Sequence, residues 1–214
     1  MTLMKANLLC GNRNLPKDIL VNSADADWIG IDRGTLILLE AGITPQFAVG
    51  DFDSITQEEK SFIERQIEIN PYNSEKDDTD LALGIAQAIQ SGYKEIHVFG
   101  ATGGRLDHFL GALQILEKPE YVEEDIVIKL IDQSNEIQFL KRGLYDIEAN
   151  DLYPYISFIP ASYPTVITLK YFKYNLYKET LEQGSTLTIS NEITSSHGEV
   201  EVIEGNVLMI RSRD

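Results

Sequence analysis

Strand-like and helix-like segments alternate along the first two-thirds of this 214-residue chain. Runs of β-branched and other apolar residues stand at residues 7–10, 28–31, 47–49, 67–69, 96–99 and 126–131. Helical spacing of apolar residues stands between them, at residues 34–41, 56–66, 79–90 and 106–117. Alternation of this kind is typical of a mostly parallel sheet covered by helices. We therefore expect residues 1–133 to form an α/β domain.

The pattern changes near Ser134, where helical periodicity ends. Short runs rich in β-branched and aromatic residues follow, at residues 137–140, 155–159, 166–172, 186–189, 199–203 and 207–210. Glycines and prolines separate them and mark turns, Gly143 and Gly184 among them. The sequence predicts a smaller antiparallel β domain of the sandwich type at residues 134–214.

The composition argues against several classes of function. The net charge is −16 and lysines and arginines form no cluster, so neither nucleic acid nor an anionic membrane is an expected partner. No apolar run approaches the roughly 18 residues of a membrane span, and the first residues lack the pattern of a secretory signal. We expect a cytoplasmic protein whose single cysteine, Cys10, is a buried thiol.

Four polar clusters lie beside predicted strands of the first domain. In an open parallel sheet, the carboxyl ends of the strands form the crevice that binds ligands. We therefore expect the clusters to meet at one edge of the sheet. They are residues 32–34 (Asp-Arg-Gly), 50–54 (Gly-Asp-Phe-Asp-Ser), 76–80 (Lys-Asp-Asp-Thr-Asp) and 100–108 (Gly-Ala-Thr-Gly-Gly-Arg-Leu-Asp-His).

Asp51 and Asp53 form the first candidate metal site. Residues two apart on an extended segment point to the same side, and two adjacent carboxylates repel unless a cation lies between them or one is protonated. Magnesium prefers such hard oxygen ligands. The alternative is a solvated turn in which Asp53 and Ser54 cap the helix expected at residues 56–66.

The cluster at residues 76–80 mixes one cation with three acids at a helix start. Asp77 or Asp78 would make a good N-cap, and Asp80 would lie in the first turn, where the helix dipole favours negative charge. Capping does not explain Lys76. A lysine that contacts phosphate beside metal-binding carboxylates would explain the mixture, and both interpretations remain open.

The segment 100–108 is a glycine-rich turn between a strand and a helix. Free backbone N–H groups and the helix N-terminus cradle phosphate in such turns, and Gly103 and Gly104 supply the backbone freedom. Arg105 is unfavourable at a helix start unless it has an anionic partner such as phosphate. Asp107 could bind a metal or accept from a ligand hydroxyl. Together the clusters predict magnesium-assisted phosphoryl transfer without naming a substrate.

These motifs resemble those of the thiamine pyrophosphokinase family along nearly the whole chain. Residues 50–54, 76–80 and 100–108 resemble the family's three signature motifs, in order, and residues 32–34 resemble a fourth that is Asp-Gly-Gly in many members. Residues 184–192 resemble its thiamine-binding segment. The resemblance implies an ATP- and Mg²⁺-binding catalytic domain at residues 1–133 and a thiamine-binding β-sandwich at residues 134–214. It also implies a homodimer with the active site at the subunit interface.

The reaction that the resemblance implies is attack of the thiamine hydroxyl on the β-phosphorus of ATP, with release of AMP. Asp51, Asp53 and Asp80 would hold Mg²⁺, and one of these acids, with Asp80 as the candidate, would take the hydroxyl proton. Asp77 and Asp107 would support the site, while Lys76 and Arg105 would stabilise the charge of the transferred group. The expected ATP contacts are Asp32, Arg33, Gly34, Gly50, Thr102, Gly103 and Arg105, and the expected thiamine contacts are Ser190 and Asn191.

One feature departs from the family and two alternative functions remain. Animal and fungal relatives place a tryptophan in the thiamine-binding segment, but the only tryptophan here is Trp28, in the other domain. Another aromatic ring must stack on thiamine, or none does.

Two alternative functions remain. One is a metal-dependent phosphohydrolase, although that class would offer more metal-binding histidines than the three present. The other is a non-catalytic nucleotide-binding regulator.

Overall fold

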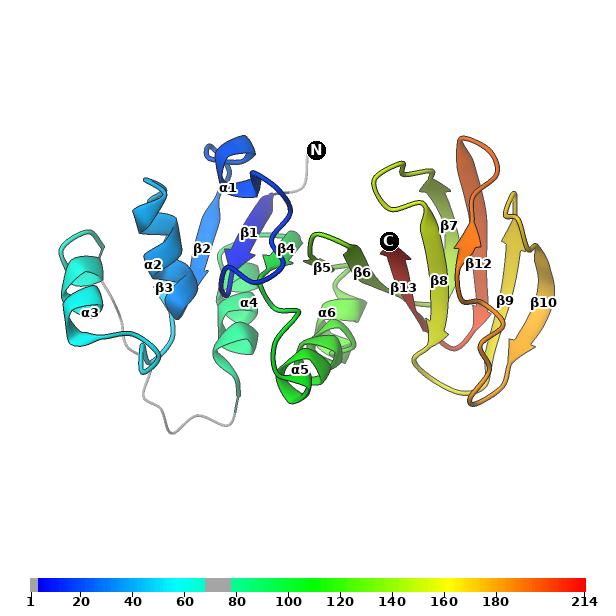
Figure 1. Ribbon diagram of the computed structural model, residues 1–214. Coiled ribbons are helices and arrows are strands. Elements are labelled where there is room, and N and C mark those ends of the chain that lie inside the picture. Colours follow the sequence, from blue (N-terminus) through cyan, green and yellow to red (C-terminus); the bar gives the residue numbers. More distant parts are fainter. Residues whose placement is uncertain (1–3, 68–77) are drawn as a thin grey trace. The chain divides into compact units, whose positions relative to one another are not determined.

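The structure is a computed structural model that describes residues 4–67 and 78–214 (Figure 1). The chain divides into two compact units, Met1–Gln133 and Ser134–Asp214. The division falls at the position where the helical pattern of the sequence ends.

A parallel sheet forms the centre of the first unit. Its strands are β1 (Lys5–Leu9), β2 (Trp28–Ile31), β3 (Phe47–Val49), β4 (Glu95–Phe99) and β5 (Val127–Ile131), which stand in the order β3-β2-β1-β4-β5. Each neighbouring pair is parallel. The chain places β2 and β3 on one side of β1 and then β4 and β5 on the other. The direction of strand addition therefore reverses between β1 and β4.

Helices cover both faces of this sheet. They are α1 (Ile19–Asn22), α2 (Arg33–Glu40), α3 (Gln57–Glu64), α4 (Asp80–Gln90), α5 (Leu106–Leu116) and α6 (Pro119–Glu123). Leu9 packs in one core cluster with Leu38 of α2, whereas Leu8 lies against Gly84 of α4. Adjacent strand residues face opposite sides, so α2 and α4 cover opposite faces. The α/β prediction for this part of the chain is confirmed. No helix of the described residues is long and apolar enough to cross a bilayer.

Helix α3 is capped by a threonine and not by the aspartates before it. The Thr56 hydroxyl accepts a hydrogen bond from the Glu59 backbone N–H (3.3 Å), and the Glu59 carboxylate accepts one from the Thr56 N–H (2.7 Å). This reciprocal pair satisfies two N–H groups that the helix leaves unbonded. The alternative in which Asp53 and Ser54 cap this helix is therefore wrong.

The second unit contains two antiparallel sheets. Their strands are β6 (Asn135–Leu140), β7 (Gly143–Glu148), β8 (Tyr155–Pro160), β9 (Thr165–Lys170), β10 (Leu176–Leu181), β11 (Asn191–Glu192), β12 (His197–Glu204) and β13 (Val207–Ser212). One sheet has the order β11-β8-β13-β6 and the other the order β10-β9-β12-β7. Phe158 of the first sheet and Val200 of the second belong to one buried cluster. The antiparallel prediction is confirmed, and the shared core agrees in outline with a β-sandwich.

Two details of the sequence interpretation are wrong, and a third lies mostly outside the described residues. Residues 186–189 form turns and not a strand, because Thr188 is buried and donates to the Phe158 carbonyl while Leu187 is exposed. Gly143, expected in a turn, begins β7. Of the strand expected at residues 67–69, only Ile67 is described, and it is not in a strand.

Candidate active site

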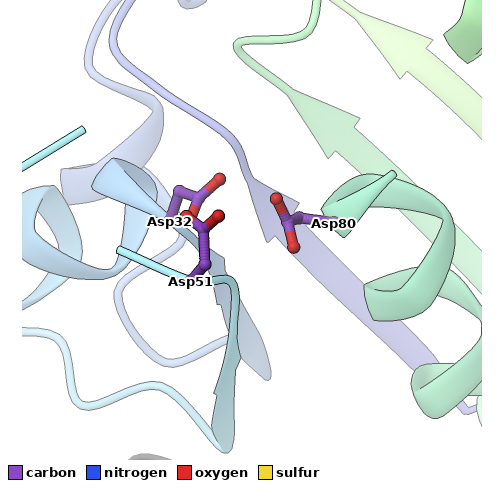
Figure 2. A group of neighbouring side chains, drawn as sticks. All are labelled: Asp32, Asp51 and Asp80. Atoms are coloured by element: carbon purple, nitrogen blue, oxygen red, sulfur yellow. The ribbon is translucent and has the colours of Figure 1, made fainter. Parts of the chain in front are cut away.

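Three aspartates converge at the carboxyl edge of the parallel sheet (Figure 2). Asp32 directly follows β2, Asp51 follows β3 after one glycine, and Asp80 begins α4. Each offers a carboxylate oxygen, and these oxygens all lie within 4.8 Å of one another. Figure 2 shows Asp32 and Asp51 facing Asp80 from the opposite side. Within residues 4–67 and 78–214, this is the one group of three or more acidic, histidine or cysteine side chains close enough to share a metal ion.

The backbone at Asp32 is strained in a way that fixes its carboxylate. Asp32 has φ 46° and ψ −122°, a conformation that residues with a side chain rarely adopt. Its N–H donates to the Val49 carbonyl (2.9 Å), and its Oδ1 accepts from the Phe52 N–H (3.3 Å). Strain of this kind persists only where the surroundings impose it, and it concentrates at functional sites. Here the hydrogen bonds with Val49, at the end of β3, and with Phe52, in the turn after β3, hold Asp32 in its strained conformation.

The turn after β3 separates Asp51 from Asp53. Phe52 has φ 59° and buries its ring beside Ala48 and Ile63, so the segment is not extended. The Asp53 N–H instead donates to Oδ1 of Asp51 (3.0 Å). The expectation that Asp51 and Asp53 lie on an extended segment is therefore wrong. Asp53 is exposed and lies outside the group of three, and its binding of a metal stays a prediction.

Asp80 is held in place by the first turn of α4. The N-cap is Thr79, whose hydroxyl accepts from the Ala82 N–H (3.3 Å), so the expectation of Asp78 as N-cap is wrong. Asp78 instead pairs with Lys118 (2.9 Å). Asp80 lies in the first turn as predicted, where the helix dipole favours its charge. Lys76 and Asp77 lie outside the described residues.

The three carboxylates repel one another electrostatically. Burial, and then the charge of Asp80, raises the pKa of Asp32 from 3.8 to about 7. The pKa of Asp80 is also raised, by burial first and then by the charges of Asp51 and Asp53. Asp32 and Asp80 also share a hydrogen bond. Like charges at this distance are stable only when one carboxyl keeps a proton or a cation lies between them.

The Cys10 thiol near this group is half-buried and resists deprotonation. Burial, and then the negative charge of Asp32, raises the pKa of the Cys10 thiol to about 12. Reactivity belongs to the thiolate, so Cys10 is an unreactive thiol as expected, although it is half-buried and not fully buried as the sequence predicted.

The glycine-rich turn follows β4, as predicted. Gly100 and Gly103 have φ 74° and 73°, which their lack of a side chain permits. Thr102 is buried, and its hydroxyl donates to Oδ2 of Asp132 after β5 (2.6 Å). The hydroxyl of Thr102 therefore fixes the turn, and its contact with ATP stays a prediction.

Arg105 and Asp107 pair with each other. The guanidinium of Arg105 donates to both carboxylate oxygens of Asp107, from Nη2 (2.6 Å) and from Nε (3.1 Å). The hydrogen bond from Arg105 is the main cause that lowers the pKa of Asp107 from 3.8 to about 2. Arg105 is the N-cap of α5 and not part of its first turn. The anionic partner that its position requires is thus Asp107, and neither residue belongs to the carboxylate group.

Two other residues expected to contact ATP, Arg33 and Gly34, have structural roles. Arg33 pairs with Glu59 of α3, with 3.6 Å between Nη2 and Oε1. Gly34 is buried, and a Cβ atom there would lie 1.7 Å from the Leu9 carbonyl oxygen. Gly34 therefore permits α2 to approach β1 closely. ATP contacts at both positions stay predictions.

Ser190 and Asn191 lie in the second unit. The Asn191 side chain is buried and donates to the Tyr174 carbonyl from Nδ2 (2.8 Å), while its Oδ1 accepts from the Tyr174 N–H (3.0 Å). Both ends of the amide are thus satisfied by one neighbouring turn. Ser190 is exposed, with φ 55°, and its N–H donates to Oγ of Ser157 (3.0 Å).

The sequence interpretation missed the place of Asp32 in the carboxylate group. It assigned Asp32 to ATP and gave the metal to Asp51, Asp53 and Asp80. The signal was nevertheless present, because Asp32 directly follows a wholly apolar strand, as Asp51 nearly does. Parallel strands bring such positions to one edge.

Comparisons with known proteins cover both units of the chain. Residues 19–130 match the family model described as "Thiamin pyrophosphokinase, catalytic domain", and residues 145–207 match "Thiamin pyrophosphokinase, vitamin B1 binding domain". The chain is 48% identical over 189 residues to a thiamine pyrophosphokinase of Bacillus subtilis (strain 168), with 87% of each chain covered.

Two solved structures agree with this similarity. A probable thiamine pyrophosphokinase from Staphylococcus saprophyticus has 61% sequence identity and a TM-score of 0.82, with 99% of this chain and 100% of that chain covered. A thiamine pyrophosphokinase from Bacillus subtilis has 44% identity and a TM-score of 0.89, with 98% and 99% covered.

Proposed function

The chain belongs to the thiamin pyrophosphokinase family, and on this premise we propose that it transfers the pyrophosphoryl group of ATP to the hydroxyl of thiamine. ATP and thiamine are its substrates, and thiamine diphosphate and AMP are the products. The match of family models to both units, catalytic and vitamin B1-binding, carries this conclusion. The carboxylates at the carboxyl edge of the first unit supply chemistry of the required kind.

The carboxylate group fits a magnesium ion. Its three donors are hard oxygens on three separate segments, and Mg²⁺ commonly takes one or two carboxylates together with substrate phosphates. Burial, and then the charges of neighbouring carboxylates, raise the pKa values of Asp32 and Asp80, and a bound cation would offset this repulsion. Asp32, Asp51 and Asp80 would hold the ion, with Asp53 as a further candidate. When bound, Mg²⁺ would supply positive charge to the phosphate oxygens.

Residues of the chain would position the reacting groups. The thiamine hydroxyl oxygen forms a bond to the β-phosphorus, the bond from that phosphorus to the oxygen of the α-phosphate breaks, and AMP leaves. Asp80 is the candidate to accept the hydroxyl proton. Backbone N–H groups of the glycine-rich turn would donate to phosphate oxygens. Lys76 and Arg105 would neutralise charge on the transferred group, in a reaction that depends mainly on positioning and electrostatics.

The second unit would contribute the thiamine site. Ser190 is exposed and available to a ligand. The Asn191 amide is occupied by Tyr174, so its expected role is to shape the segment beside Ser190.

We also propose a homodimer with the active site at the subunit interface, in the cytoplasm. The proposal follows from the resemblance, and one feature of the first unit supports it. Leu106 and Leu110, one turn apart on α5, are 76% and 59% exposed, and apolar surface of this kind is enriched where subunits meet. Light scattering measures the mass in solution, and a monomer with full activity would contradict the shared site.

Nucleotide chromatography tests the reaction. Purified protein is mixed with ATP and Mg²⁺, with and without thiamine. We expect AMP and thiamine diphosphate to form together, and only when both substrates and the metal are present. Release of AMP or ADP without thiamine would indicate a phosphohydrolase. Bound ATP without any turnover would indicate a nucleotide-binding regulator.

A further inference from the structure

The loops after β1 and β4 pack against each other at the carboxyl edge of the sheet. The two strands are parallel neighbours, with Leu9 opposite Phe99, and the Cys10 N–H donates to the Phe99 carbonyl (2.9 Å). A Cβ atom on Gly100 would lie 2.2 Å from the carbonyl oxygen of Gly11, so the two backbones touch. The strand order reverses between β1 and β4. Open α/β sheets bind their ligands at such a reversal.

Two polar side chains of the first loop lie on the glycine-rich turn. A Cβ atom on Gly104 would lie 2.2 Å from Nη1 of Arg13, and one on Gly103 would lie 2.2 Å from Nδ2 of Asn14. The glycines therefore leave room for these hydrogen-bond donors. Asn14 is itself anchored, because its carbonyl accepts from the Gln133 N–H (2.7 Å). Donors from one loop thus adjoin the backbone donors of the other.

The charge of Arg13 has no partner in the described part of the chain. Arg105, the arginine that the sequence interpretation placed on phosphate, already pairs with Asp107. Arg13 is exposed, and no carboxylate of residues 4–67 and 78–214 forms an ion pair with it. The whole chain has 34 acidic residues and 18 lysines and arginines. An uncompensated arginine beside a phosphate-binding type of turn is therefore placed to meet an anionic ligand.

We propose that Arg13 binds a phosphate group of ATP, with the Asn14 amide as a second donor. This rests on the proposed function, which supplies the triphosphate. A guanidinium can donate two parallel hydrogen bonds to one phosphate, and a lysine ammonium cannot reproduce that geometry. The glycine-rich turn and the loop of residues 11–14 then form two sides of one phosphate site. The segment 11–14 (Gly-Asn-Arg-Asn) has no part in the motifs that suggested ATP binding.

Three variants and two kinds of measurement test the proposal. Arg13→Gln removes the charge, Arg13→Lys keeps it without the paired donors, and Lys17→Ala removes an exposed cation of the same loop as a matched control. The Michaelis constants for ATP and for thiamine are measured, and calorimetry gives the affinities for ATP and for adenosine. Thermal denaturation confirms that each variant is folded.

We expect Arg13→Gln to weaken ATP binding about tenfold, the loss of one charged hydrogen bond, with an intermediate effect of Arg13→Lys. In Arg13→Gln, the affinity for adenosine and the Michaelis constant for thiamine should change less than twofold. In Lys17→Ala, the affinity for ATP should also change less than twofold. If Arg13→Gln and Lys17→Ala weaken ATP binding equally, Arg13 is only a solvated surface cation. Equal losses for ATP and adenosine would assign it a structural role.

The binding measurement also separates this proposal from the proposed function. A wild-type protein that binds ATP but makes no thiamine diphosphate would overturn the proposed reaction. The difference between ATP and adenosine affinities in Arg13→Gln would still support or reject the phosphate contact.

Discussion

Gly50 leaves the space that the Asp32 carboxylate occupies, since a Cβ atom at position 50 would lie 2.1 Å from Oδ1 of Asp32. Gly50 also has φ 147°, which strains any residue with a side chain. We expect Gly50→Ala to displace Asp32 and to weaken Mg²⁺ binding roughly tenfold, as supporting residues of metal sites do when changed.

Gly42→Ala is the matched control for this prediction. Gly42 also has a left-handed backbone (φ 75°), but nothing lies within 4 Å of the Cβ it would gain. Both variants should lose about 1 kcal/mol of stability through backbone strain. Only Gly50→Ala should lose Mg²⁺ affinity, measured by calorimetry. Equal Mg²⁺ affinity in the two variants would show that Asp32 keeps its position without the glycine.

The affinity for Mg²⁺ should rise with pH. The pKa of Asp32 is about 7, raised first by burial, so below that pH the ion must displace a proton. Between pH 5.5 and pH 8 we expect affinity to increase tenfold or more and then to level off, roughly as the ionised fraction of Asp32 does. Calorimetry in two buffers of different ionisation enthalpy should detect proton release at pH 6. Asp32→Asn should abolish that release, and its persistence would assign the proton to another group.

Without metal, Asp32 should destabilise the folded protein at neutral and higher pH. A carboxyl whose pKa rises from 3.8 to about 7 on folding favours the folded state while protonated, and that advantage is lost as pH rises through this window. In EDTA at pH 8 we expect Asp32→Asn to raise the free energy of unfolding by about 1 kcal/mol. At pH 4 the variant should equal the wild type.

Asp25→Asn is the control for that experiment, because Asp25 is exposed and the substitution changes the net charge equally. Urea denaturation measures the free energy of unfolding of both variants. If Asp25→Asn stabilises the protein as much as Asp32→Asn does, the effect comes from overall charge and not from the carboxylate group.

Sequence periodicity predicted all five strands of the parallel sheet and missed two largely exposed strands of the second unit. Strands β2 and β3 have the predicted limits, and helix α4 differs from its prediction by one residue. The missed strands β7 and β10 are the two edges of the four-stranded sheet, and most of their residues are not buried. An edge strand has little buried surface, so its sequence carries a weak apolar alternation.

The sequence indicated the chemistry of the site but not its exact membership. Position after a strand placed Asp32 and Asp51 at one edge, because that follows from a parallel sheet. Asp80 reaches the same edge from the start of α4, and the strand expected before it lies mostly outside the described residues. The positive φ of Phe52, whose ring is buried in a cluster with Ala48 and Ile63, breaks the extended segment that the sequence interpretation assumed for Asp51 and Asp53. Arg13 escaped notice because only the pairing of β1 with β4 brings its loop to the glycine-rich turn.

Ser190 and Asn191 should respond differently to loss of their side chains, although the resemblance assigns both to thiamine. Asn191→Ala leaves the Tyr174 N–H and carbonyl without their partners, which should cost about 2 kcal/mol of stability and lower the melting temperature. Asn191→Asp keeps the acceptor for the N–H and should lose less. Ser190→Ala removes only an exposed hydroxyl, so the melting temperature should hold while the Michaelis constant for thiamine rises. If Asn191→Ala instead melts like the wild type and binds thiamine poorly, the amide contacts the substrate directly, and Tyr174 is held in place by the rest of its turn.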